Sequence, residues 1–142
     1  MPKRTSSAVW NGDLKGGKGT MRVGRTGYEG PYSFVSRFEE GPGTNPEELI
    51  AAAAAGCFSM ALSADLGGAG HSPRSVSTRA TVTVEKHGAG FKITLIELEA
   101  EADVPGIDQA AFQKIAEGTK TGCPVSQALS AVPIRLKATL KK

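Results

Sequence analysis

The chain has 142 residues, 39% of them apolar and 22% charged, so we expect one globular domain over residues 1–142. The formal net charge of +3 is spread along the sequence and aromatic residues make up only 6%, which disfavours a nucleic-acid partner, since nucleic-acid binding usually needs a basic face with stacking aromatics. No apolar run approaches the roughly 20 residues that span a bilayer, and the first residues lack the apolar segment of a signal peptide, so we expect a cytoplasmic protein without a membrane partner.

The first 40 residues predict short β-strands separated by glycine-rich turns. The strand segments are residues 8–10, 20–23 and 32–38. The turn at residues 12–20 is similar to a phosphate-binding loop, but Gly19 stands where that motif needs Ser or Thr after its lysine. Because a strand-like segment follows this turn instead of a helix, we interpret the turn as a hairpin loop.

A long central helix is predicted to start after residue 45. Asn45 can act as its N-cap, Pro46 suits the first helical position, and the two glutamates that follow suit the positive end of the helix dipole. The helix should continue to about Leu66, where two glycines follow. Within residues 49–62 only Ser59 is polar, and a helix that is apolar on all sides is expected to be buried all round. A small domain rarely covers such a helix alone, so we expect a second subunit to cover it.

The second half predicts a β-hairpin, two helices and a last strand. Residues 76–84 alternate in polarity, a turn follows at residues 87–90, and the apolar phase of the next strand changes at Leu95 and Ile96, which suggests a bulge. Asp108 can cap the next helix, a short helix opens after residue 123, and residues 132–140 alternate again. Strands, a helix, and then strands and helices together indicate the α+β class.

The two cysteines, Cys57 and Cys123, are the residues most suited to chemistry. They form no CxxC pair, and the two histidines lie in turns, so we expect no metal and no cofactor. Structural disulfides are uncommon in a reducing cytoplasm, which leaves inert buried thiols or a redox pair. Cys123 precedes Pro124 at a helix N-cap, where a thiolate is stabilised. Cys57 lies deep in an apolar helix and should have a raised pKa unless a cation lies beside it, so local structure favours Cys123 as the reactive thiol.

Three stretches together resemble the OsmC/Ohr family of thiol peroxidases. They are SRFE at residues 36–39, GTNPEEL at 43–49 with CFSM at 57–60, and GCPVS at 122–126. The resemblance covers nearly the whole chain and is closer to the OsmC branch, because Arg37 lies shortly before the central helix. It implies an OsmC-like α+β fold with an N-terminal β-sheet, a long buried central helix, and a C-terminal hairpin with helices and a last strand, in an intertwined homodimer.

The same resemblance implies the roles of four residues. Cys57 would be the peroxidatic thiol and Cys123 the resolving thiol, with Arg37 and Glu47 as the activating pair. The implied reaction reduces organic hydroperoxides, and hydrogen peroxide more weakly, through a Cys57 sulfenic acid and a Cys57–Cys123 disulfide, and protects against oxidative stress. An external dithiol, such as that of a lipoylated protein, would reduce the disulfide.

Three apolar residues near these positions could line a substrate pocket. They are Phe38, Phe58 and Met60, and each taken singly is more typical of plain core. Glu47 and Cys57 are ten residues apart on one predicted helix, or roughly 15 Å along its axis, so an antiparallel partner helix would be needed to bring Glu47 of one chain near Cys57 of the other. The alternative function is a non-catalytic, redox-sensing dimer.

Overall fold

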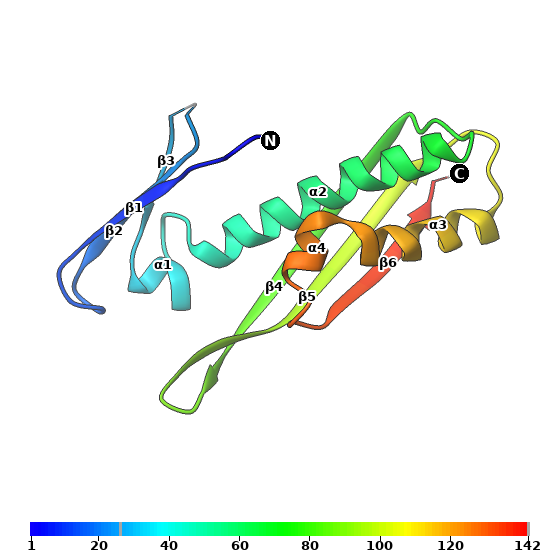
Figure 1. Ribbon diagram of the computed structural model, residues 1–142. Coiled ribbons are helices and arrows are strands. Elements are labelled where there is room, and N and C mark those ends of the chain that lie inside the picture. Colours follow the sequence, from blue (N-terminus) through cyan, green and yellow to red (C-terminus); the bar gives the residue numbers. More distant parts are fainter. Residues whose placement is uncertain (26, 142) are drawn as a thin grey trace. The chain divides into compact units, whose positions relative to one another are not determined.

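A computed structural model describes residues 1–25 and 27–141, and the chain forms two units, Met1–Leu49 and Ile50–Lys142. Strands and helices are mixed along the chain, which confirms the α+β class (Figure 1). In chain order the elements are β1 (Ser7–Asn11), β2 (Lys18–Val23), β3 (Tyr28–Tyr32), α1 (Phe34–Phe38), α2 (Pro46–Gly68), β4 (Ser75–His87), β5 (Gly90–Asp103), α3 (Gln109–Gly122), α4 (Pro124–Ala128) and β6 (Ile134–Leu140).

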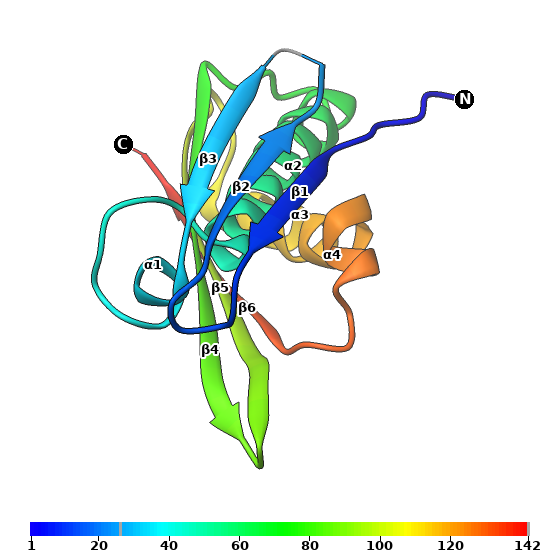
Figure 2. The same cartoon turned by 90° about the vertical axis from the view of Figure 1, so that its left-hand side faces the viewer.

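The N-terminal unit contains an antiparallel sheet with strand order β1-β2-β3 (Figure 2). β1 pairs with β2 from Ser7 opposite Arg22 to Asn11 opposite Lys18, which confirms the hairpin predicted between them. The rings of Trp10 and Tyr32 lie 5.3 Å apart on either side of Gly19. A Cβ atom at Gly19 would come within 2.5 Å of the Tyr32 ring, so glycine at this position lets the two aromatic rings approach.

Helix α1 corrects the strand predicted over residues 32–38. β3 ends at Tyr32, and α1 begins directly after Ser33. The Ser33 hydroxyl accepts a hydrogen bond from the Ser36 amide at 3.1 Å, and the Ser36 hydroxyl accepts one from the Ser33 amide at 2.8 Å. This reciprocal pair is a capping box built from two serines, where Glu or Gln is usual at the second position. Capping therefore overrides the strand tendency of the aromatic and β-branched residues in this segment.

The C-terminal unit is a three-stranded sheet with order β4-β5-β6, and its helices lie on one face of that sheet (Figures 1 and 2). β4 and β5 form the predicted hairpin, whereas β6 runs parallel to β5 and so needs a crossover, which α3 and α4 provide. The β4–β5 register shifts between Thr83 and Val84, which pair with Leu95 and Ile93. Thr94 is therefore the extra residue, one position before the predicted bulge.

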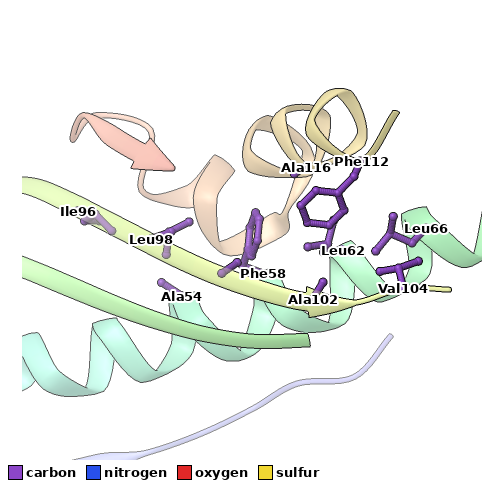
Figure 3. Packing of buried hydrophobic residues seen from close by; sticks show 11 residues of the cluster. Ala54, Phe58, Leu62, Leu66, Ile96, Leu98, Ala102, Val104, Phe112 and Ala116 are labelled. Carbon is purple, nitrogen blue, oxygen red and sulfur yellow. The ribbon is translucent and has the colours of Figure 1, made fainter. Parts of the chain in front are cut away.

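The hydrophobic core of this unit lies between the helices and the inner face of the sheet (Figure 3). α2 contributes every fourth residue from Ala54 to Leu66, a spacing that keeps side chains on one helix face. Phe58 of α2 and Phe112 of α3 are both 0% exposed. The remaining fully packed members come from β5, the residue that follows it, and α3: Ile96, Leu98, Ala100, Ala102, Val104 and Ala116.

Only one face of α2 is buried within a single chain, as expected for a helix that a small domain does not cover alone. Cover of the other face by a second subunit stays a prediction. Ala53, Gly56 and Ala64 are exposed on the other face, and Met60 is 78% exposed. By length and composition α2 could also span a membrane, because its alanines count as apolar, contrary to the expectation from the sequence. One such helix is weak evidence for a span, since core helices of soluble proteins pass the same test.

Candidate active site

Arg37 and Glu47 form a two-point ion pair within the N-terminal unit. Arg37 Nε lies 3.2 and 3.3 Å from the two carboxylate oxygens of Glu47, and Nη2 lies 2.9 Å from Oε1. The Glu47 side chain is 8% exposed and the Arg37 side chain 37%. A buried carboxylate that accepts from Nε and Nη2, along one edge of the guanidinium, fixes its orientation and leaves its other N–H groups free of this contact.

An apolar cavity of about 200 Å³ lies beside Arg37 in the same unit. The Phe38 ring forms part of its wall and lies 4.9 Å from the Arg37 guanidinium carbon. Lys15 adds a second cation near the cavity, with Nζ 5.9 Å from the centre of the Phe34 ring. The lining residues are Trp10, Leu14, Tyr32, Ser33, Phe34, Arg37 and Phe38.

The two cysteines are brought together in the C-terminal unit, although 66 positions separate them in sequence. Both are free thiols, and their Sγ atoms lie 2.7 Å apart in one hydrogen bond. Cys57 comes from the middle of α2, and Cys123 from the junction between α3 and α4. Cys123 is 1% exposed. Two sulfur atoms at this separation can form a disulfide if one of them is oxidised.

The two thiols have opposite pKa shifts. Burial raises the pKa of Cys57, and the hydrogen bond with Cys123 raises it further. Burial also acts to raise the pKa of Cys123, but hydrogen bonding to Cys57, and to Ser126 and Val125 at the start of α4, outweighs burial and lowers it. The directions agree with the local expectation that Cys123 is the thiol more easily ionised.

The predicted pocket residues have different surroundings. Phe38 lines the cavity beside Arg37, whereas Phe58 belongs to the hydrophobic core and Met60 is exposed in the single chain. Sequence reasoning missed the other three aromatic residues that line this cavity, Trp10 of β1, Tyr32 of β3 and Phe34 of α1. Trp10 is expected only as the last residue of a strand segment. Tyr32 and Phe34 line the same cavity because α1 is helical.

The α+β chain thus holds two free thiols in contact in one unit and an arginine–carboxylate ion pair in the other. Residues 39–137 match the family model described as OsmC-like protein, and the chain belongs to the OsmC family. It is 52% identical over 130 residues to "Peroxiredoxin OsmC" of Escherichia coli (strain K12), with 90% of each chain covered. The assignment to the OsmC/Ohr family from sequence motifs is confirmed, and the chain is a peroxidase of this type.

Two further comparisons agree with this assignment. The chain is 36% identical over 89 residues to "Organic hydroperoxide resistance protein" of Xanthomonas axonopodis pv. citri (strain 306), which covers 62% of this chain and 61% of that protein. The crystal structure of an OsmC-like protein from Mycoplasma pneumoniae has a TM-score of 0.76 at 16% identity, with 99% of both chains covered. At this low identity the structural likeness establishes the fold, and the OsmC-like fold is confirmed.

Proposed function

We propose that the protein reduces organic hydroperoxides, with Cys57 as the peroxidatic thiol and Cys123 as the resolving thiol. The observation that carries this proposal is the approach of two free sulfur atoms to 2.7 Å in a chain of the OsmC family. A protein that only needed buried packing at these positions would gain nothing from pairing its two thiols.

The proposed reaction has three balanced steps. The Cys57 thiolate attacks the peroxide oxygen distal to the organic group, the O–O bond breaks, and the alkoxide takes a proton and leaves as the alcohol. Cys57 is then a sulfenic acid. Cys123 attacks the Cys57 sulfur, the S–O bond breaks, water leaves after protonation, and a disulfide forms. An external dithiol donates two electrons and two protons by exchange, which restores both thiols and oxidises the dithiol.

Arg37 and Glu47 are proposed to activate Cys57. Burial raises the pKa of the Cys57 thiol, and only the thiolate attacks peroxide efficiently, so Cys57 requires a cation. Arg37 is permanently charged, and its planar fork can serve the sulfur and a peroxide oxygen together. The buried Glu47 carboxylate would hold that fork in place.

The cavity beside Arg37 supports a preference for organic substrates. Its wall is mostly aromatic, and such a surface stabilises an apolar substituent by removing it from water. Hydrogen peroxide has no such substituent. We therefore propose that the organic group of the hydroperoxide occupies this cavity and that hydrogen peroxide reacts more slowly.

A second copy of the chain is proposed to complete each active site. Glu47 and Cys57 are ten residues apart along one helix, which is a long reach for one arginine. The exposed face of α2 consists largely of alanine and glycine with Met60, and small residues let two helices approach closely. An antiparallel pair of these helices would give an intertwined homodimer with two sites.

The reductant is proposed to be a dithiol such as a dihydrolipoyl group on a carrier protein. The proposed cycle needs both cysteines returned to thiols, which suits a reducing compartment. We therefore propose a cytoplasmic location, where the protein would protect against oxidative stress. The competing function is a dimer whose thiols only sense oxidation.

A coupled assay separates these functions. The reduced protein is mixed with an organic hydroperoxide, lipoamide, lipoamide dehydrogenase and NADH, and the loss of NADH is followed. We expect turnover in the wild type and none in Cys57→Ser. Cys123→Ser should still form the sulfenic acid, detected by mass spectrometry after trapping with dimedone. Full turnover in Cys57→Ser with loss in Cys123→Ser would invert the assignment, and one oxidation per chain without turnover would favour the sensor.

A further inference from the structure

Two buried polar side chains join α1 to the start of α2. Ser36 is 6% exposed and Asn45 is 8% exposed. The Ser36 hydroxyl donates to the carbonyl oxygen of Thr44 at 2.8 Å, and the Asn45 side-chain NH2 donates to the carbonyl oxygen of Ser36 at 2.9 Å. The two residues thus tie the segments together in both directions. Removing one partner of a buried hydrogen bond is costly, because the other partner stays desolvated.

Asn45 uses both ends of its amide. Its side-chain oxygen accepts from the Glu48 amide at 2.8 Å and caps α2, while its NH2 group holds the backbone of α1. Ser, Thr and Asp are also good N-caps, but among these short side chains only Asn provides an acceptor and an N–H donor together. Capping alone therefore does not require asparagine at this position, whereas joining the two helices does.

This link lies directly beside the arginine clamp. Arg37 follows Ser36 in the chain, and Glu47 comes two residues after Asn45. α1 has only five residues, and so short a helix is not stable by itself. The position of Arg37 relative to Glu47 therefore depends on contacts that hold α1 to the first turn of α2.

The loop between the two helices is also held closely. Gly43 has a φ of +107°, and a Cβ atom there would lie 2.6 Å from the carbonyl oxygen of Pro31. That same carbonyl accepts from the Thr44 amide at 2.9 Å. The segment before Asn45 is thereby held against the end of β3, which also holds the backbone from which the Asn45 side chain extends.

We propose that Asn45 is a positioning residue for Arg37: its amide holds α1 against the start of α2, so that the guanidinium keeps its two-point contact with Glu47. The inference deepens the proposed function, because that oriented guanidinium is the group assigned to activate Cys57. Asn45 itself acts through Arg37 and contacts no reacting atom.

The test uses Asn45→Ser, which keeps a capping oxygen and removes the donor to Ser36. The direct measurement is the hydrogen-exchange rate of the Arg37 Nε–H, observed by NMR and assigned with Arg37→Lys. We expect this N–H to exchange about tenfold faster or more in Asn45→Ser, and the oxidation of Cys57 by an organic hydroperoxide to slow by about tenfold to a hundredfold, as small misplacements of catalytic groups do. Unchanged exchange and oxidation rates would overturn the proposal.

Asp108→Ala is the matched control, because Asp108 caps α3 through the Ala111 amide at 2.8 Å in the other unit. It should lower the melting temperature while leaving Arg37 exchange and Cys57 oxidation unchanged. If Asn45→Ser does not fold, Asn45→Asp replaces it, because Asp keeps a strong cap and places an oxygen against the Ser36 carbonyl. Faster Arg37 Nε–H exchange and slower Cys57 oxidation are expected again. Unchanged rates in this variant would overturn the proposal. The exchange measurement does not need activity. An inactive wild type would therefore count against the proposed function and not against the role of Asn45 in positioning Arg37.

Discussion

Cys57 and Cys123 differ in pKa although their sulfur atoms lie 2.7 Å apart. Burial raises the pKa of Cys57, and hydrogen bonding lowers that of Cys123. Two groups so close titrate as a pair, and the first proton lost leaves the negative charge chiefly on Cys123. A lowered pKa also suits a resolving thiol, which must attack a sulfenic acid as the thiolate. The thiol pair alone therefore does not favour ionisation of Cys57, and the proposed role of Cys57 requires a cation, for which we propose Arg37.

The Arg37 dependence predicts a change in pH profile. In a Cys123→Ser background, Arg37→Ala leaves the half-buried Cys57 thiol with no cation from Arg37, while partial burial, the largest cause that raises its pKa, remains. Since the thiolate fraction rises with pH, the rate of Cys57 oxidation in this variant should be low near neutrality and increase towards alkaline pH. At neutral pH, each unit of increase in the Cys57 pKa should lower the rate by about tenfold. With Arg37 present, the rate should level off at a lower pH. Stopped-flow oxidation across a pH series measures both profiles.

Arg37→Lys is the control for this experiment, because it keeps the charge and loses the planar fork. Its profile should resemble the wild type in midpoint but reach a lower maximum rate. If the protein with Arg37 and the Arg37→Ala variant had identical pH profiles, another group would be responsible for ionising Cys57.

At the scale of elements, local signals predicted α2 and missed α1. Asn45 and Pro46 mark the start of α2 within one residue, because capping and proline geometry are local. The segment at residues 32–38 is rich in aromatic and β-branched residues, and its helix depends on the Ser33–Ser36 box and on the tertiary bond from Asn45. Propensity does not include such long-range contacts.

The site shows the same division between local and tertiary information. Local reasoning found both thiols and the correct directions of their pKa shifts, but their contact joins α2 to the start of α4 and was implied only by the family resemblance. The cavity beside Arg37 was partly missed, because it is lined by residues from β1, β3 and α1. Its shape follows from packing and could not be derived from spacing along the chain.

The packing of α3 on the core gives a prediction for stability. Phe112 is 0% exposed, so Phe112→Ala should lower the free energy of unfolding by about 3–5 kcal/mol, through lost apolar burial and the cavity left behind. Urea unfolding at fixed protein concentration under reducing conditions measures the change. Tyr28→Ala removes a ring that is 52% exposed and should cost much less, within about 1 kcal/mol. Equal losses in the two variants would mean that the α3 face is not part of the core.

For the whole molecule, the exposed face of α2 is the feature that one chain leaves unexplained. Met60, 78% exposed, projects from a face made largely of alanine and glycine on a helix whose opposite face is core. Contiguous exposed apolar faces often mark an interaction surface. The same helix carries Glu47 near its start and Cys57 near its middle, so pairing two copies through this face would link assembly to catalysis.

Met60→Glu tests that link. In a single exposed chain this substitution should change stability by no more than about 0.5 kcal/mol, but between two packed helices it buries an unpaired charge, which costs several kcal/mol. We expect the wild type to be dimeric by light scattering, and Met60→Glu to shift towards monomer and lose peroxidase activity in proportion. Ala110→Glu adds the same charge at an exposed position in the first turn of α3 and should stay dimeric and active. In the proposed shared site, Arg37 and Glu47 of one copy serve Cys57 of the other. A Met60→Glu protein that is monomeric yet fully active would contradict this arrangement and place the complete site in one chain.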